Sequence, residues 1–147
     1  MGRPEPAPGA QTSRPVILLD THVVLWREAD SRLISAAAAR AIAREETLLV
    51  SPLSFYEIGV LVTKQRIQLD RPLRRWTHDL LGDDLIELAP LSPGAASHAA
   101  ALDPSFPGDP IDRLLYATAL DLGVPMVSKD RRIREFAALA RDVKVIW

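Results

Sequence analysis

Residues 16–22 read VILLDTH, in which four consecutive apolar side chains end at an acid, Asp20. A short apolar run of this length is typical of a strand that is buried on both faces, and such strands form parallel sheets covered by helices. In sheets of this kind, ligands bind beyond the carboxyl ends of the strands. The segment therefore predicts a strand over Val16–Leu19 and places Asp20 at the chemically active edge of the sheet.

The rest of the chain alternates short apolar runs with amphipathic stretches. We expect further strands at Thr47–Val50, Leu85–Leu88, Pro125–Val127 and Val143–Ile146. We expect helices at Ser35–Arg44, Ser54–Lys64, Pro72–Leu81, Gly94–Leu102, Pro110–Leu122 and Arg131–Ala140. Gly123, followed by Pro125, is a helix-stop signal. This alternation predicts an α/β fold of three layers, in which a central parallel sheet is flanked by helices.

The chain of 147 residues suits a single domain. Four prolines and two glycines within residues 1–15 predict a flexible Pro-rich leader, and residues 16–147 are expected to form the domain. No apolar run is long enough to cross a membrane, and the leader lacks the apolar core of a signal peptide.

The composition excludes several classes of site. The chain has no cysteine, so disulfides, zinc–thiolate centres and thiol nucleophiles are excluded, and a reducing cytoplasm is the expected location. A formal net charge of −1 is unlike that of a strongly basic nucleic-acid-binding protein. A nucleic-acid partner would therefore be held by local basic patches or through a bound metal.

Four acids lie where an α/β fold places its chemistry: Asp20, Glu57, Asp112 and Asp130. Two of them follow apolar strands, and two are expected at the starts of helices. The segments around them are strongly apolar, and several buried carboxylates repel one another unless a cation compensates them. Oxygen ligands without Cys or His are those that Mg²⁺ and Mn²⁺ prefer. We therefore expect these acids to form a metal site.

Each acid also has a purely structural interpretation. Aspartate is favoured at helix N-caps, where its carboxylate accepts backbone hydrogen bonds, and Asp20 and Asp130 are both placed for this. Ser54 and Glu57 match a capping box. Asp109 matches an N-cap, with Pro110 as the first helical residue and Asp112 in the first turn. Spacing alone leaves both interpretations open.

Four segments, LLDTHVVLW, VSPLSFYEIGVLVTKQRIQL, GDPIDRLLYATAL and PMVSKD, occur in that order. Together they resemble the PIN-domain nucleases, and more narrowly the VapC-type toxins of type II toxin–antitoxin systems. The resemblance covers nearly the whole of residues 16–147. It implies that Asp20, Glu57, Asp112 and Asp130 are the family's four catalytic, metal-binding acids. It also implies that Ser128 is the hydroxyl residue of the last motif, which stands where Thr is common.

The resemblance further implies an activity and partners. The activity is endoribonuclease cleavage of RNA phosphodiester bonds with Mg²⁺, or with Mn²⁺, as the cofactor. The partners are an RNA substrate, a cognate antitoxin protein and a second copy of the chain in a homodimer. Asp109 is an additional acid in the third motif, and Thr21 and Ser54 are candidates for holding carboxylates in orientation.

Three other functions remain open. The chain could be a non-catalytic PIN-like domain that only binds protein. An aspartyl phosphatase would require D-x-D after the first strand, where this chain has D-T-H. A histidine mechanism would depend on His22, His78 and His98, of which the last two fall in expected surface helices.

Two basic runs are candidates for RNA contacts. Residues 64–75 hold five basic residues and one acid, and residues 129–134 hold four basic residues and one acid. Such runs either bind phosphates or form solvated helix faces. Residues 54–62 are more apolar than one core-facing stripe requires, which predicts either an interface or burial beneath a neighbouring helix.

Overall fold

The computed structural model describes residues 15–147. The expected leader therefore lies outside the described residues, except for Pro15. The carbonyl oxygen of Pro15 accepts hydrogen bonds from the backbone N–H groups of Glu46 and Thr47, so this residue is already attached to the domain.

Five parallel strands form one sheet in the order β3-β2-β1-β4-β5. Their bounds are β1 Val16–Leu19, β2 Thr47–Val50, β3 Ile86–Leu88, β4 Met126–Val127 and β5 Val145–Ile146. The predicted parallel sheet is confirmed. In its register, Leu18 of β1 lies opposite Leu49 of β2 on one side and Met126 of β4 on the other.

Seven α-helices surround the sheet within the described residues: α1 Thr21–Ala29, α2 Ala36–Ala43, α3 Pro52–Thr63, α4 Leu73–Leu81, α5 Pro93–Ala101, α6 Pro110–Leu122 and α7 Arg131–Ala140. A short 3₁₀ helix, η1 Ser31–Leu33, follows α1. The six predicted helices are present, whereas α1 was not predicted. Gly123 ends α6 in the left-handed conformation, as its helix-stop signal indicates.

Helix α3 begins at Pro52, two residues earlier than predicted. Ser51 is its N-cap and accepts a hydrogen bond from the backbone N–H of Leu53, and the fixed φ of Pro52 suits the first helical position. Ser54 is therefore not a cap, and the capping-box interpretation of Ser54 and Glu57 is wrong. Glu57 lies in the middle of α3 rather than at its start.

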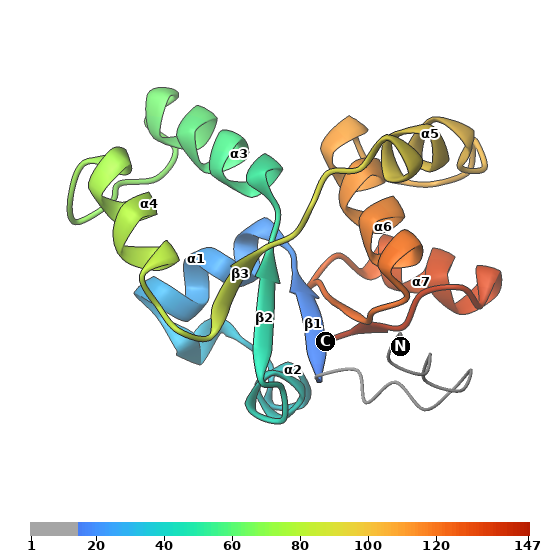
Figure 1. Cartoon of the computed structure of the whole chain (residues 1–147), viewed down its shortest axis with the longest axis horizontal. Helices are drawn as coiled ribbons and strands as arrows, with labels where there is room; N and C mark the ends of the chain where they lie inside the picture. The colour runs from blue at the N-terminus through green and yellow to red at the C-terminus, as the bar shows by residue number, and fades with distance from the viewer. Residues whose placement is uncertain (1–14) are drawn as a thin grey trace, which may run out of the picture.

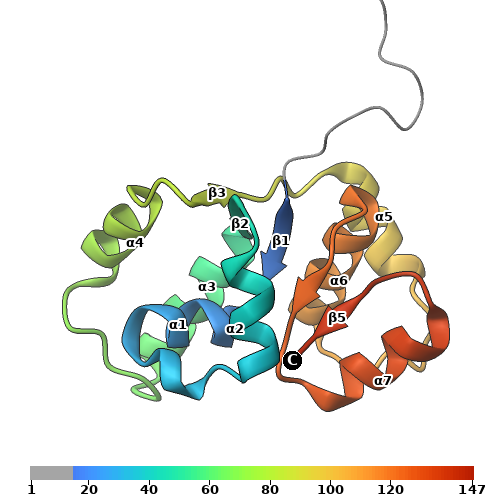
Figure 2. The ribbon, with the colours of Figure 1, turned by 90° about the horizontal axis from the view of Figure 1, so that it is seen from below.

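The helices cover the two faces of the sheet separately, α1 to α4 on one face and α5 to α7 on the other (Figures 1 and 2). Alternate strand residues enter the two cores: Ile17 and Leu19 pack in the first core, and Leu18 packs in the second. All three are fully buried, so the central strand is fixed from both sides. This three-layer arrangement confirms the predicted fold class.

The strands point their carboxyl ends toward the space between α3 and α6 (Figure 1). The elements that follow the strands, α1, α3 and α7, begin at this edge, and the start of α6 reaches it from the other side of the sheet. No helix among the described residues is both long and apolar enough to cross a membrane.

Candidate functional site

Asp20 follows β1 directly and is the N-cap of α1. Its Oδ1 accepts a hydrogen bond of 2.7 Å from the backbone N–H of Thr21, and its Oδ2 accepts one of 2.7 Å from the Ser128 hydroxyl. The residue is 7% exposed, and this burial raises the pKa of its carboxyl, although both hydrogen bonds oppose the change. Asp20 is thus a rigidly held, buried carboxyl at the edge of the sheet.

Ser128 connects Asp20 to the fourth acid. While its hydroxyl donates to Asp20, it also accepts a hydrogen bond of 3.1 Å from the backbone N–H of Asp130. Asp130 is the N-cap of α7 and accepts hydrogen bonds from the backbone N–H groups of Arg132 and Ile133. Its charge contributes to the raised pKa of Asp20, so the two acids lie within electrostatic range.

Glu57 reaches the same region from α3. The side chain of Thr21 hydrogen-bonds to it, which favours its charged form, but burial and the nearby Asp20 and Asp109 raise its pKa overall. Thr21 also shares a buried hydrogen bond of 2.9 Å between its hydroxyl and that of Ser54. The hydroxyl of Thr21 therefore links the start of α1 to α3 beside two of the acids.

Asp112 closes a capping box at the start of α6. Its backbone N–H donates to Asp109 Oδ1 at 2.9 Å, and its own Oδ2 accepts from the backbone N–H of Asp109 at 3.2 Å. Burial, together with the charges of Asp109, Asp20 and Glu57, raises the pKa of Asp112 to about 7. Burial therefore makes the charged form of Asp112 unfavourable first, and the neighbouring acids add to this effect.

Gly108 allows the loop before α6 to press against Asp112, a feature that no sequence signal indicated. A Cβ at position 108 would collide with the Cβ of Asp112 and would lie 2.7 Å from Cε1 of Phe106. Only a residue without a side chain fits, so the local packing of this glycine sets the position of Asp112.

The four predicted acids thus come from four separate segments and influence one another electrostatically. Their oxygen donors and their mutual repulsion suit a hard divalent cation. Within residues 15–147, however, no three His, Asp or Glu side chains already lie in an arrangement that could hold a metal ion. The acids fit a metal by donor type and charge, but in this conformation they are neighbours rather than a closed ligand set. Their role as metal ligands stays a prediction.

The capping interpretation holds at the same time. Asp20, Asp109 and Asp130 are all N-caps with side-chain hydrogen bonds to the helix, and Asp112 completes a capping box. Capping fixes each carboxylate through backbone N–H groups at a helix start. These hydrogen bonds therefore orient the acids and do not exclude a second role.

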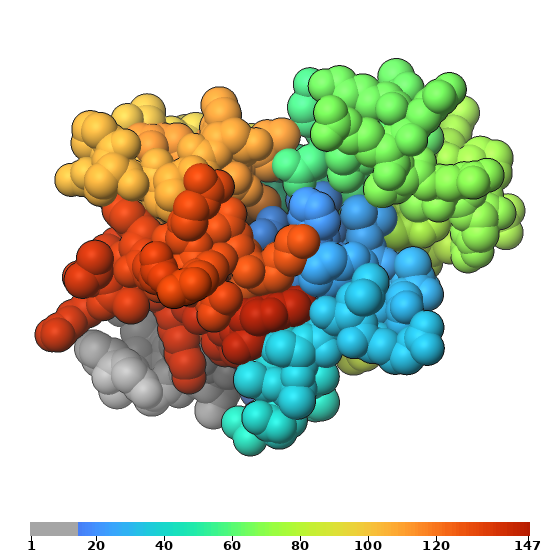
Figure 3. Space-filling view, turned by 180° about the vertical axis from the view of Figure 1, so that it is seen from behind, coloured from blue at the N-terminus to red at the C-terminus, as the bar shows by residue number. Residues whose placement is uncertain are grey.

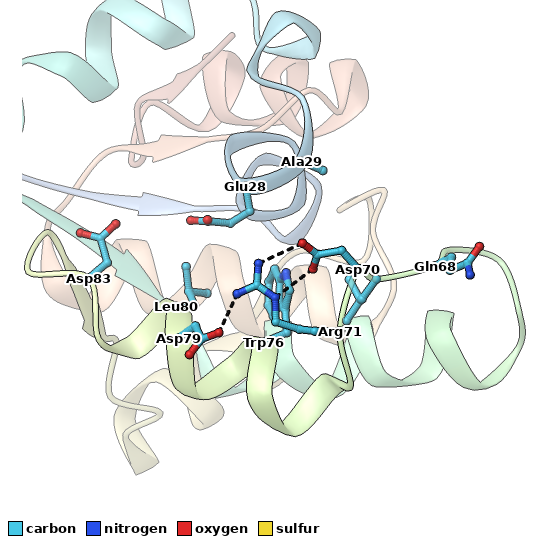
Figure 4. Close-up of a pocket in the computed structure, with 10 residues that line it drawn as sticks. Glu28, Ala29, Gln68, Asp70, Arg71, Trp76, Asp79, Leu80 and Asp83 are labelled. Carbon is cyan, nitrogen blue, oxygen red and sulfur yellow. Dashed lines mark hydrogen bonds and ion pairs between the residues drawn. The ribbon is translucent and has the colours of Figure 1, made fainter.

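The basic run at residues 64–75 is partly neutralised. Arg71 bridges Asp70 and Asp79 (Figure 4). Arg75 also pairs with Asp79. Asp70, Arg71 and Asp79 border a cavity of about 480 Å³ between α1 and α4, which Glu28 and Asp83 also line. With four carboxylates and one guanidinium, this cavity is unsuited to phosphate.

The predicted positions of two histidines are confirmed, because His78 on α4 and His98 on α5 are both exposed on helix surfaces. His22 is also exposed, but it lies close enough for its charge to lower the pKa of both Asp20 and Glu57.

Comparison with known proteins gives a consistent result. Residues 17–139 match the PIN domain family. Ribonuclease VapC22 of Mycobacterium tuberculosis (strain ATCC 25618 / H37Rv) is 42% identical over 118 residues, which cover 80% of this chain and 89% of that protein.

Two solved structures share the fold. One is a toxin–antitoxin complex from Klebsiella pneumoniae, with a TM-score of 0.59, 18% identity, and coverage of 80% of this chain and 89% of that chain. The other is VapBC2 from Rickettsia felis bound to a DNA fragment from their promoter, with a TM-score of 0.63, 12% identity, and coverage of 88% and 96%. At these identities the two structures support the fold alone.

Proposed function

Because this chain belongs to the PIN-domain family, we propose that it is a Mg²⁺-dependent endoribonuclease and the toxin of a toxin–antitoxin pair. The observation that carries the proposal is that four motif acids lie near one another at the carboxyl edge of the sheet, where burial and the charges of neighbouring acids raise the pKa of Asp112 to about 7. A bound cation relieves both the burial of negative charge and the repulsion between the acids. The 42% identity to a ribonuclease over most of the chain supports RNA as the substrate.

The proposed reaction is hydrolysis of an RNA phosphodiester that leaves a 5′-phosphate and a 3′-hydroxyl. Mg²⁺ or Mn²⁺, when bound, supplies the positive charge that activates water and stabilises charge developing on the phosphate. Asp20 and Asp112 are the residues we assign as its direct ligands, with Glu57 and Asp130 completing the site directly or through water. Ser128 and Thr21 keep Asp20 and Glu57 in place by hydrogen bonds, so that little reorganisation is needed.

The partners follow from the same family. We propose a cognate antitoxin protein that blocks the acidic site, as the similarity to toxin–antitoxin complexes suggests. We also propose a homodimer. It is supported by α3, most of whose residues are apolar, although Ile58 is the one apolar residue of this helix that is buried and Tyr56 is 65% exposed. Of the described residues, Leu73 at the start of α4 packs against Gly59 on this face, while Tyr56 stays exposed, so an interface is favoured over complete burial within the chain.

The test is cleavage of total RNA by the purified protein, with Mg²⁺ and with EDTA. We expect cleavage only with the metal, and products with 5′-phosphate ends. Asp20→Asn should abolish cleavage with little loss of thermal stability, because Asn keeps the capping oxygen while a repelled charge is removed. Asp84→Asn, at an exposed acid before β3, is the matched control and should cleave normally.

Cleavage that persists in EDTA would contradict the metal mechanism. RNA products that end in a cyclic phosphate would indicate histidine chemistry instead. A folded protein that cleaves no RNA in either condition would favour the non-catalytic protein-binding domain.

A further inference from the structure

Beside the acids, α1 carries a group of rings that the proposed mechanism does not use. The ring of His22 lies 5.9 Å from that of Trp26, and the ring of Trp26 lies 5.8 Å from that of Trp147. The ammonium of Lys129 sits 4.7 Å from the centre of the Trp26 ring, within the range of a cation–π contact. Three elements therefore contribute to this group: α1 supplies two rings, the C-terminus supplies a third ring, and the β4–α7 loop supplies the cation.

His22 and Trp26 also form one wall of a cavity of about 370 Å³ between α1 and the segment that follows α3. Its lining includes the half-buried apolar residues Leu61, Ile67 and Leu69 and the exposed polar residues Arg66 and Gln68. The volume is within the range of sites that hold small organic ligands, about 300–1,000 Å³. Seen from behind, the surface of α1 is open between the lobe of α3 and α4 and the lobe of α5 and α6 (Figure 3).

The cavity adjoins the acids. His22, which lines the cavity, follows Asp20 by two residues in the first turn of α1. Lys129 is the residue directly before Asp130. A group held against His22 would therefore belong to a nucleotide at or next to the scissile phosphate.

We propose that this cavity, here called the α1 pocket and defined by His22, Trp26, Arg66 and Gln68, binds an unpaired base of single-stranded RNA. Aromatic side chains stack on bases of any sequence, and neighbouring cations hold the adjoining phosphates. Arg66 and Lys129 supply those cations, and the pocket is lined by no carboxylate. The amide of Gln68 offers both a donor and an acceptor to a base edge.

The alternative occupant is a side chain of a protein partner. The charges favour RNA here, because the cavity between α1 and α4 is lined by four carboxylates that would attract a basic peptide, whereas the α1 pocket is lined by Arg66 and by no carboxylate. The inference rests on the proposed function for its substrate class, but its test does not depend on cleavage.

The test measures binding in EDTA, where the proposed cleavage does not occur. One probe is a short single-stranded RNA of mixed sequence labelled with fluorescein, and the other is a ribose-phosphate strand of equal length without bases. Both carry the same number of phosphates, so the ratio of the two dissociation constants reports contacts to bases. We expect the wild-type protein to bind the strand with bases about tenfold more tightly, the size of one stacked base.

His22→Ala and Gln68→Ala should bring this ratio toward one without changing the affinity for the baseless strand. Lys129→Ala should weaken both strands alike and reduce the salt dependence, as the loss of a phosphate contact does. His98→Ala, at an exposed histidine on α5, is the matched control and should keep the wild-type ratio. Tryptophan fluorescence of the wild-type protein, which comes from Trp26, Trp76 and Trp147, should be quenched by the strand with bases only, as a base held beside Trp26 predicts.

A wild-type ratio near one, or a ratio that survives His22→Ala, would overturn the proposal and leave the α1 pocket to a peptide side chain. The cleavage assay with total RNA separates the two claims. If the protein cleaves RNA but binds both strands equally well, only this inference is rejected. If it prefers the strand with bases, loses that preference in His22→Ala and cleaves no RNA, only the nuclease activity is rejected.

Discussion

Asp112 serves two purposes at the residue scale. Its carboxylate closes the capping box with Asp109, and it also lies among the charges of Asp20 and Glu57. The first contact requires an oxygen acceptor only, whereas the second makes the ionised form unfavourable in the absence of a cation. The cap and the candidate site therefore respond differently to the removal of charge, and an Asp→Asn substitution separates them.

The pKa of Asp112 predicts a pH-dependent stability of the metal-free protein. The pKa in the folded chain is about 7 and the ordinary value is 3.8, so between these limits the folded chain binds more protons than the unfolded chain. The contribution of this group therefore falls as pH rises from about 4 to about 7. We expect Asp112→Asn to raise the free energy of unfolding in EDTA by about 1–2 kcal/mol at about pH 8, a value reduced for solvent screening.

Urea unfolding at about pH 8 and about pH 4.5 measures this effect. The gain should be smaller at the lower pH, where the wild-type carboxyl is already protonated, and Asp84→Asn should show no such difference. An equal gain at both pH values would mean that charge repulsion at Asp112 is not its source.

Gly108 gives a steric prediction at the same scale. Because a Cβ there would collide with Asp112, we expect Gly108→Ala to shift this acid and lower the cleavage rate by about 10- to 100-fold, as small misplacements of catalytic groups do. Gly94→Ala is the control, since its nearest neighbour would be Asp121 Oδ1 at an ordinary 3.5 Å. Normal cleavage by a folded Gly108→Ala protein would show that the position of Asp112 is not critical.

At the scale of elements, the Thr21–Ser54 hydrogen bond joins α1 to α3 inside the domain. Thr21→Val keeps the shape of the side chain but leaves the buried hydroxyl of Ser54 without this partner, which costs about 1–3 kcal/mol of unfolding free energy. The double variant with Ser54→Ala should lose less than the sum of the single variants, because no unpaired hydroxyl remains. Additive losses in urea unfolding would show that the two hydroxyls act independently.

The elements also show what the sequence could and could not predict. Strand β1 and helix α6 were predicted with correct bounds, because local signals mark their ends. A short apolar run defines β1, and Pro110 and Gly123 mark the start and the end of α6. Helix α1 was missed because its apolar residues continue the run of β1, and only the cap at Asp20 separates them. The start of α3 was misplaced because Ser54 imitates a cap that Ser51 provides.

The sequence motifs predict which acids form the candidate site, and that assignment stays a prediction, but the motifs do not predict the contacts that hold these acids in place. The acids stand in recognisable motifs, whereas their meeting depends on the strand order, which brings β4 beside β1 across more than a hundred residues. The hydrogen bonds of Ser128 and the close packing of Gly108 depend on tertiary contacts, and no local pattern encodes them.

At the scale of the whole molecule, the exposed apolar face of α3 predicts self-association. A cavity of about 660 Å³ on this face is lined by Phe55, Tyr56, Val60 and Leu73 among others. We expect Tyr56→Glu to shift a dimer toward monomer in sedimentation, because a charge would be buried without a partner. Leu139→Glu, at an exposed leucine on α7, is the control. A Tyr56→Glu protein that sediments as the wild type would place the dimer interface elsewhere.

The acidic edge as a whole predicts how the proposed antitoxin and the metal interact. Four carboxylates at one edge favour any cation, and an arginine side chain binds carboxylate in a two-pronged way that a partner protein can supply. We therefore expect the antitoxin to insert a basic side chain, most favourably Arg, among Asp20, Glu57, Asp112 and Asp130. Antitoxin and Mg²⁺ would then neutralise the same charges, and each would weaken the apparent affinity of the other.

Titration of the toxin–antitoxin complex with rising Mg²⁺ measures this competition, with equal ionic strength kept by a monovalent salt. The dissociation constant of the antitoxin should rise with Mg²⁺, and the rise should be smaller in Asp112→Asn, because that variant has less charge to neutralise. Asp84→Asn should follow the wild type. If the affinity for the antitoxin changes neither with Mg²⁺ nor in Asp112→Asn, inhibition takes place at the dimer face or at the RNA-binding surface. Only contacts away from the acids would leave both measurements unchanged.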